Sequence, residues 1–334
     1  MSDTGVAGLT VGGGVGYLRT KHGMTIDNVI AMQVVTANGK IQKCDKENHP
    51  DLFHALRGGG GGYALVTSFT LKVYPIPEEH FTIMWAWDAE LFPKILAALQ
   101  AFMDSGTDEE TSLLSVYWPN CGIPHPELQG KTKAFISGGI ASDPGEDTKE
   151  MYARVKAFIW DKVGVEPIDL SHPVPFNSWN KGFDFFFPMG TDHAYWKGSY
   201  VTRFSEELAQ DIMDVVETRP PEADKGIVGL WATYGKMLRP DDTDVAFSKR
   251  HAGGFVSFDT TWSTGSAADE TCIDYTRRGA AALEKYADGA YLQWAGFEDE
   301  RKAASGKQYD DIEKLKTIKK KYDPDFLFPS WIQM

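Results

Sequence analysis

Two glycine clusters near the start of the chain contain the residue types that could lie directly against a ligand. The first spans Thr4–Tyr17 and reads TGVAGLTVGGGVGY, and the second is Gly58–Gly62. Because glycine lacks a side chain, phosphates or a flat ring can contact such backbone, and successive N–H groups can form an anion-binding concavity. Tight turns explain the first cluster equally well, since it contains neither a GxGxxG pattern nor a P-loop. Five ordered glycines cost about 0.5–1 kcal/mol each relative to alanine, which favours a close backbone approach at the second cluster over a flexible loop.

Outside these clusters, candidate chemical groups are few. Asp259 lies between Phe258 and Thr260 on an expected strand, where it is either a buried base or an ordinary carboxylate at a sheet edge, and we favour the edge. His193 could line a cleft, but a surface position at the start of a strand is the simpler expectation. The aromatic run 183–189 is either core packing or the wall of an apolar pocket.

Composition excludes several classes of protein. The 334 residues include 47 acidic and 34 basic side chains, a net charge of −13 that argues against nucleic-acid binding. Three scattered cysteines (Cys44, Cys121 and Cys272) are too few for a disulfide framework and lack zinc-site spacing. No apolar run approaches the roughly 20 residues of a membrane helix, and the first residues lack signal-peptide features. We therefore expect a cytoplasmic or otherwise reduced compartment, with no metal and no membrane partner.

The elements expected around the second glycine cluster form a compact β-leaning unit. A strand at 29–36, the turn Asn38-Gly39 and a returning strand at 41–44 predict a hairpin. A short helix at 50–56 then starts with proline, and a half-buried strand follows at 65–74. The sequence Pro-Ile-Pro that comes next is the clearest domain boundary in the chain.

Residues 77–300 alternate expected strands and helices. The expected strands are 81–87, 133–140, 193–200, 227–234, 254–262 and 290–294, and the expected helices are 92–103, 148–163, 206–216 and 268–286. This pattern predicts an α+β domain with an antiparallel sheet covered by helices on one face. A basic amphipathic helix is expected at 309–321, near the end of the chain.

Several stretches together resemble the berberine bridge enzyme-like group of FAD-linked oxidases, in the vanillyl-alcohol oxidase superfamily. Within residues 8–61 these are GLTVGGGVGYL, KHGMTIDNV, VVTANG and PDLFHALRGGGG. The resemblance is specific over residues 4–75 and returns in YLQW (291–294) and KKKYDPDFLF (319–328). Between these regions it is weaker.

The resemblance implies the carboxy-terminal part of a PCMH-type FAD-binding domain, built from both chain ends, and a separate substrate domain. The implied divisions are 1–76 for the second flavin subdomain, 77–300 for the α+β substrate domain and 301–334 for the berberine-type segment. It also implies FAD as cofactor, although the chain could have lost it. The implied cofactor-binding residues are Gly8, Thr10, Gly12, Gly13, Gly14, Tyr17, Asp27 and Val66.

The chain also departs from the family pattern. We expect it to begin after the first flavin subdomain, which carries the histidine that can link covalently to FAD. Phe326 stands where the family has a flavin-contacting asparagine, and Gly62-Tyr63-Ala64 replaces Asn-Phe-Gly. Trp294 occupies the position of a tyrosine base and cannot accept a proton, and a glutamate base falls on Phe255. The resemblance thus implies an intact scaffold with fewer cofactor and acid–base groups.

The expected substrate cavity lies between two strands. We predict that 254–262 and 290–294 are neighbours in one sheet, with Phe255 and Asp259 on the same face of the first strand. A cavity lined by these residues and Trp294 would be apolar with one or two polar anchors, as small-molecule sites usually are. Asp259 and Trp294 are therefore the candidate catalytic residues.

Three functional hypotheses follow. The first is an FAD-linked oxidoreductase that oxidises a small, largely apolar secondary metabolite or alcohol with oxygen as acceptor. The second is a flavin-free cyclase that retains the substrate cavity, because pericyclic chemistry depends mainly on orientation. The third is a non-catalytic protein that binds small molecules. A homo-oligomer or a partner chain that completes the flavin domain is compatible with the first hypothesis.

Overall fold

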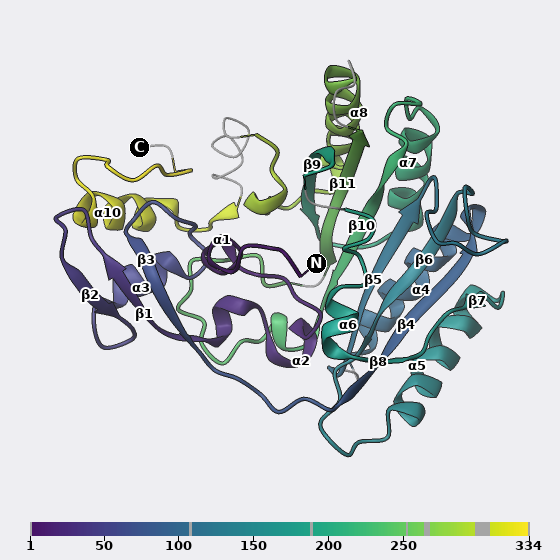
Figure 1. Ribbon diagram of the computed structural model, residues 1–334, viewed down its shortest axis with the longest axis horizontal. Helices are drawn as coiled ribbons and strands as arrows, with labels where there is room; N and C mark the ends of the chain where they lie inside the picture. The colour runs from purple at the N-terminus through teal and green to yellow at the C-terminus, as the bar shows by residue number, and fades with distance from the viewer. Residues whose placement is uncertain are drawn as a thin grey trace. The chain divides into compact units, whose positions relative to one another are not determined.

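The computed structural model describes residues 2–106, 109–187, 190–251, 253–263, 268–297 and 308–332. The chain divides into two compact units, which we describe separately (Figure 1). Most of unit 1 is formed by Pro75–Tyr234 and His251–Asp288. Unit 2 is formed by Thr4–Tyr74, Gly235–Arg250 and Gly289–Met334. Within the described ranges, no helix is both long and apolar enough to cross a membrane.

Unit 1 is built on an eight-stranded antiparallel sheet. Its strand order is β7-β4-β6-β5-β10-β11-β9, and β8 also pairs with β4. The strands are β4 (Glu79–Asp88), β5 (Thr111–Trp118), β6 (Lys133–Ile140), β7 (Ile168–Asp169), β8 (Pro173–Pro175), β9 (Asp192–Val201), β10 (Lys225–Thr233) and β11 (Gly253–Ser263). The long strand β11 lies between β10 and β9, so it is an interior strand.

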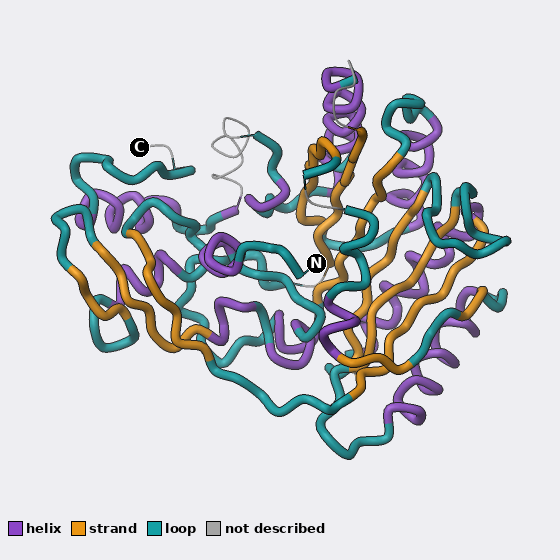
Figure 2. Tube along the Cα trace, in the orientation of Figure 1, coloured by secondary structure: helices purple, strands orange, loops and turns teal. Residues whose placement is uncertain are grey.

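Helices cover one face of this sheet, as Figure 2 shows. They are α4 (Phe92–Ser105), α5 (Thr148–Val163), α7 (Glu206–Glu217) and α8 (Asp269–Ala282); the shorter elements of the unit are α6 (Phe176–Asn180), η2 (Ala89–Leu91) and η4 (Glu284–Tyr286). The buried core lies between the layers, where Val256 and Phe258 of β11 join Leu208 and Ile212 of α7. Alternation along β11 therefore directs every second residue to the helices and the others to the opposite face.

Unit 2 joins a three-stranded antiparallel sheet to short helices. The strand order is β2-β1-β3. Its elements are α1 (Val6–Gly12), α2 (Arg19–His22), η1 (Thr25–Asn28), β1 (Val29–Val35), β2 (Ile41–Cys44), α3 (Pro50–Leu56), β3 (Leu65–Leu71), η3 (Gly235–Met237), η5 (Leu292–Trp294) and α10 (Ile312–Tyr322). Val34 and Leu56 share a core with Leu315 and Ile318 of α10, so segments from both ends of the chain complete one unit.

Most expected elements are confirmed. The helices expected at 50–56 and 148–163 and the strand expected at 133–140 have the same bounds in the structure. The predicted hairpin is also present, and Gly39 in its turn has a φ of 76°, which glycine adopts easily. The antiparallel sheet covered by helices confirms the α+β class.

One expectation is wrong, and the first glycine cluster contains an element that was not expected, because Val6–Gly12 form helix α1. The strand expected at 290–294 does not exist, and Leu292–Trp294 form a 3₁₀ turn in unit 2. Two hydrogen bonds hold the turn: the Leu292 N–H donates to the side-chain oxygen of Gln308, and the Trp294 N–H donates to the Tyr291 carbonyl. Strand β9 takes the place beside β11 that we had predicted for 290–294.

Candidate functional site

Asp259 is a buried carboxyl group in the middle of the unit 1 sheet. The edge position expected from sequence is wrong, because Asp259 pairs with Ile227 of β10 on one side and with Trp196 of β9 on the other. Only 7% of Asp259 is exposed, and its Oδ1 has no hydrogen-bond partner among the described residues. The side chain lies on the face of β11 opposite the helices, because Val256 and Phe258 occupy the helix-covered face.

Burial changes the acidity of this group. Removal from water disfavours the carboxylate and raises the pKa of Asp259 to about 7. The Ser257 hydroxyl lies close enough to oppose part of this rise, although its Oγ makes no hydrogen bond of ordinary geometry within the described structure. A carboxyl group with this pKa can exchange a proton near neutral pH, as a general base must.

The surroundings of Asp259 combine glycine and aromatic side chains. Gly229 of β10 lies opposite Ser257, and a Cβ built there would lie 3.6 Å from Asp259 Oδ2. On β9, the ring of Trp196 packs edge-to-face against Phe187, with centroids 5.6 Å apart. The site is therefore a carboxyl group beside one bare backbone position and an aromatic wall.

The aromatic run contributes to this wall. Phe186 packs edge-to-face on Trp118 of β5, with ring centroids 4.6 Å apart, and Phe187 packs on Trp196. Phe185 is 77% exposed. Residues 188–189 of the run lie outside the described residues. His193, the other cleft candidate, is exposed, and its Nδ1 lies 2.9 Å from Asp269 Oδ1.

The other two residues of the expected cavity, Phe255 and Trp294, lie in different units of the structure. Phe255 is fully buried on β11 and packs edge-to-face on Tyr200, with centroids 4.9 Å apart. Trp294 is half-buried in η5 of unit 2, where its ring contacts Tyr291 at a centroid distance of 5.1 Å. Trp294 is not part of the unit 1 sheet: among the described strands, β11 pairs with β10 and β9.

The three consecutive glycines of the first cluster are packed by the protein's own side chains. A Cβ on Gly12 would lie 1.4 Å from Gln293 Nε2, and one on Gly14 would lie 2.4 Å from Thr25 Oγ1. Gly13 has a φ of 140°, and its Cβ would lie 2.7 Å from Met24. Glycine is required at Gly13 and Gly14 by φ values of 140° and 85°, whereas at Gly12 the neighbour is the end of a flexible glutamine side chain.

The backbone groups of this cluster are also used internally. The Gly14 N–H donates to the hydroxyl of Tyr291 at 3.1 Å, and the Gly13 N–H donates to the Thr10 carbonyl at 3.1 Å. The Thr10 hydroxyl in turn donates to the Val6 carbonyl at 2.6 Å. These donors are satisfied without a ligand.

The start of helix α1 has more room. A Cβ on Gly5 or Gly8 would meet no atom within 4 Å, and both glycines are exposed. Helix α1 begins without a side-chain cap, so its first N–H groups are not bonded to a capping side chain. Of the implied cofactor glycines, Gly8 is the one with space beside its backbone.

The second glycine cluster is likewise packed against the chain itself. A Cβ on Gly58 would lie 2.5 Å from Phe247, and one on Gly62 would lie 2.5 Å from the Pro329 carbonyl. The N–H groups of Gly58 and Gly60 both donate to the Val11 carbonyl at 2.9 Å. The close backbone approach expected here is thus made by other segments of unit 2.

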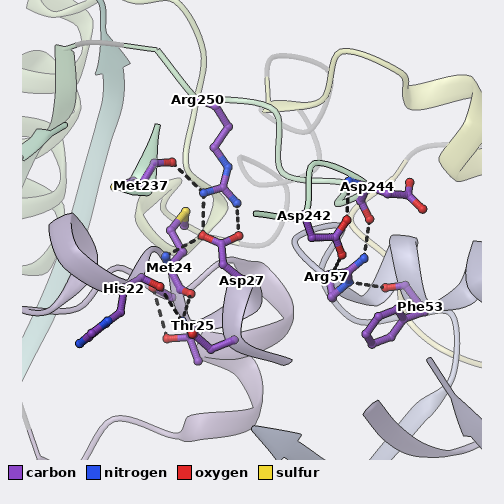
Figure 3. Close-up of polar contacts among 12 residues, drawn as sticks. His22, Met24, Thr25, Asp27, Phe53, Arg57, Met237, Asp242, Asp244 and Arg250 are labelled. Carbon is purple, nitrogen blue, oxygen red and sulfur yellow. Dashed lines mark hydrogen bonds and ion pairs between the residues drawn. The ribbon is translucent and has the colours of Figure 1, made fainter. Parts of the chain in front are cut away.

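Two arginines that sequence reasoning missed stabilise unit 2 through hydrogen bonds to acidic residues (Figure 3). Arg250 makes two hydrogen bonds to Asp27, of 2.6 and 2.9 Å. Arg57 is 2% exposed and donates to the Asp242 carboxylate at 2.5 Å and to the Asp244 carbonyl at 2.6 Å. Asp27, implied as a cofactor residue, therefore anchors the 235–250 segment. The signal available in the sequence was a cluster of acidic and basic residues at 239–250.

The remaining implied cofactor residues lie at the border of the unit 2 core. Val66 pairs with Val34 in the sheet and is half-buried against the core. Tyr17 is half-buried just before α2.

A cavity of about 370 Å³ lies elsewhere in this unit, between the 238–250 segment, His54 and the start of α10. Among the described residues, none of the implied cofactor residues lines this cavity.

Comparison with known proteins gives a consistent result. Residues 1–45 match the model of the FAD binding domain family. The chain is 27% identical to the FAD-linked oxidoreductase YvdP of Bacillus subtilis (strain 168), over 98% of this chain and 70% of that protein. Its fold is similar to glucooligosaccharide oxidase from Acremonium strictum, with a TM-score of 0.81, 21% identity and coverage of 99% of this chain and 70% of that one. It is also similar to Physcomitrella patens BBE-like 1, with a TM-score of 0.80, 20% identity and coverage of 98% and 70%.

These likenesses define the fold: the chain has the α+β architecture of the solved BBE-like and glucooligosaccharide oxidase structures, and its first residues match an FAD binding domain. The chain is similar to FAD-linked oxidoreductases over nearly its whole length. That similarity and the match of residues 1–45 to an FAD binding domain indicate an FAD-dependent enzyme.

Proposed function

We propose that this protein catalyses the FAD-linked oxidation of a hydroxyl group on a small, largely apolar metabolite or alcohol, with oxygen as the final electron acceptor. The observation that carries the proposal is Asp259, a buried carboxyl group with a pKa raised to about 7 on the face of the sheet opposite the four long helices. Similarity to FAD-linked oxidoreductases supports the redox class. Asp259 would be the base in place of the tyrosine and glutamate positions that Trp294 and Phe255 occupy.

Asp259 would accept the proton of the substrate hydroxyl. Its carboxylate fraction rises through pH 7, so the group can take up a proton near neutral pH and release it after turnover. Trp196 and Phe187 would contact the apolar body of the substrate and exclude water from the carboxyl group. When bound, FAD supplies the two-electron acceptor for the substrate carbon and passes the electrons to oxygen.

The packing of unit 2 supports one position for the FAD contact over the others. Gly12, Gly13 and Gly14 leave no space beside their backbone, whereas Gly5 and Gly8 are exposed and open. We therefore place the cofactor contact of the first cluster at Gly8 rather than at the three consecutive glycines. Asp27 would act indirectly, because its carboxylate is bonded to Arg250.

The test is to purify the protein, add FAD and record absorbance, oxygen consumption and peroxide formation with a panel of alcohols. Bound flavin gives a band near roughly 450 nm. We expect Asp259→Asn to keep the flavin band and to lower kcat/KM by about 10²- to 10⁴-fold. A protein that takes up no FAD would exclude the oxidase and favour the flavin-free cyclase or the binding protein. Unchanged kcat/KM in Asp259→Asn would exclude Asp259 as the base.

A further inference from the structure

We propose that the aromatic segment 183–187 is a lid that closes over Asp259 and must move aside before a ligand reaches this carboxyl group. The inference rests on the proposed function for the role of that ligand, because the substrate hydroxyl is placed at Asp259. The lid itself is assigned from contacts within unit 1, and its test needs neither FAD nor substrate. We call residues 183–187 the aromatic lid.

A row of four side chains crosses the face of the sheet on which Asp259 lies. Asp259 of β11 pairs with Ile227 of β10 on one side and with Trp196 of β9 on the other. Tyr117 of β5 pairs with Val228 of β10, so the residue after Tyr117 continues the row beside Ile227. Tyr117 and Val228 belong to the helix-covered core, so the row occupies the opposite face. In order across the sheet, its members are Trp118, Ile227, Asp259 and Trp196.

Two consecutive residues of the aromatic lid contact the two ends of this row. Phe186 packs edge-to-face on Trp118, with ring centroids 4.6 Å apart, and Phe187 packs on Trp196 at 5.6 Å. Adjacent strands are about 4.8 Å apart, so three strand spacings separate the backbones of the two tryptophans by roughly 14 Å. The lid backbone must therefore pass between the tryptophans, on the side of the sheet where Asp259 lies. This placement explains why Asp259 is only 7% exposed although the long helices cover the other face.

The start of the aromatic lid is held in place by hydrogen bonds at the protein surface. The Asp184 carboxylate accepts hydrogen bonds from the Ser2 hydroxyl at 2.5 Å and from the Ser2 backbone N–H at 2.9 Å. These bonds lower the pKa of Asp184. Because water reaches both partners, it can replace the bonds when they break, so the contact can open at little cost.

The chain on the amino-terminal side of the lid is anchored firmly, and glycines border the lid itself. Trp179 of α6 is 6% exposed and packs against the ring of His80, with centroids 5.7 Å apart. Gly182 directly precedes the lid, and Gly190 follows it with a φ of 76°. Glycine accommodates the backbone rotations that a hinge requires. The lid can therefore move about its ends while helix α6 stays packed.

The closed lid and the open lid have different consequences for Asp259. In the closed state, aromatic rings and backbone keep water from the carboxyl group, in keeping with the rise of its pKa to about 7. In the open state, the carboxyl group and the two tryptophans of the row become accessible to a ligand. Closure after entry would again exclude water, as lids over reactive groups commonly do.

The experiment measures how often a thiol placed under the lid meets the solvent. Asp259→Cys supplies the thiol, and its reaction rate with methyl methanethiosulfonate is followed by mass spectrometry of the labelled peptide. The native residues Cys44, Cys121 and Cys272 are buried, so they contribute little background. We expect added Asp184→Ala or Phe187→Ala to raise the labelling rate by about 5- to 10-fold, because each removes a contact that holds the lid closed.

Phe185→Ala is the matched control. Phe185 lies in the same segment, but it is 77% exposed, so its truncation should leave the labelling rate unchanged. Ile227→Cys supplies a second probe position in the same row and keeps the test valid if Asp259→Cys does not fold. Thermal melts of each variant ensure that labelling rates are compared between folded proteins.

The outcomes separate this inference from the proposed function. Equal labelling rates with and without Asp184→Ala and Phe187→Ala would overturn the lid, and so would equal acceleration by Phe185→Ala. Labelling that depends on the lid, in a protein that oxidises none of the alcohols tested, would support the lid and contradict the oxidase. Turnover that is lost in Asp259→Asn, together with labelling that no lid variant changes, would support the oxidase and overturn the lid.

Discussion

The glycine cluster Gly12–Gly14 and the strand face Ser257–Thr261 both contain groups that could bind a ligand. They differ in whether other side chains of the protein already occupy or satisfy those groups. In the cluster, Gln293, Met24 and Thr25 fill the space beside the backbone. On the strand face, side-chain oxygens are buried without partners among the described residues. A glycine-rich motif thus indicates close packing as readily as ligand binding. Unsatisfied polar atoms are the more direct sign of a site, because the protein alone does not explain them.

The largest loss of stability is expected when a side chain is added within the glycine cluster Gly12–Gly14. Gly13→Val should destabilise the protein by roughly 5 kcal/mol, because it combines a φ that valine cannot adopt with a clash at Met24. Chemical denaturation measures this loss. Gly39→Ala is the control, since Gly39 has a φ of 76° but no atom within 4 Å of its Cβ position. It should cost only about 1–2 kcal/mol. Equal losses would contradict tight packing at Gly13.

The next largest effect concerns the ion pair between the buried Arg57 and the partly exposed Asp242, which anchors the same unit. Arg57→Ala should cost about 2–3 kcal/mol, because the Asp244 carbonyl loses its hydrogen bond while Asp242 keeps its ion pair with Lys46. Lys321→Ala is the control, because Lys321 pairs with Asp51 at 2.6 Å but is 59% exposed, and it should cost about 0–1 kcal/mol. The two free energies of unfolding are compared in urea. A small loss for Arg57→Ala would show that the 235–250 segment is held by other contacts.

In contrast to the two destabilising substitutions above, replacing the buried Asp259 should increase the free energy of unfolding at neutral and alkaline pH. Folding raises the pKa of Asp259 from 3.8 to about 7, so between these pH values the folded state holds a proton that the unfolded state releases. Stability is therefore lost as the pH rises through this window. Asp259→Asn should be more stable than the wild type at pH 8, by an amount on the order of 3 kcal/mol, and should lose this advantage near pH 4. Thermal melts from pH 4 to 8 measure the difference, and parallel curves would contradict a buried, protonated Asp259.

The smallest expected effect comes from the open end of the first cluster. Gly8→Ala should stabilise helix α1 by about 0.5–1 kcal/mol, because its Cβ meets no atom within 4 Å. The same substitution should weaken FAD binding if the cofactor contacts the Gly8 backbone. Thermal melts and flavin titration of one variant test both statements. Stabilisation with unchanged flavin affinity would place the cofactor contact elsewhere.

Local sequence patterns were sufficient to predict most of the helices and strands. They were not sufficient to predict which of these elements pack or pair with one another. Helix 50–56 and strand 133–140 are encoded by proline placement and by short apolar runs, so their bounds follow from the sequence. The interior position of Asp259 depends on the order of β10, β11 and β9, which are paired over long sequence distances. Likewise, Asp27 and Arg250 are 223 residues apart, and no local rule joins them. The segment 290–294 was mispredicted because its aromatic residues favour a strand, whereas hydrogen bonds made by Gln308 and Tyr291 hold a turn.

The discontinuous assembly of unit 2 affects how the protein emerges from the ribosome. The sheet residue Val34 shares its core with Leu315 and Ile318, whereas every strand of the unit 1 sheet has been synthesised once residue 263 is added. At a synthesis rate of about 5–20 residues per second, roughly 15–50 s pass between synthesis of the three-stranded sheet of unit 2 and synthesis of helix α10, which covers its apolar face. During translation, this exposed apolar face is prone to aggregation, and the rate of synthesis over the intervening residues sets how long it stays exposed.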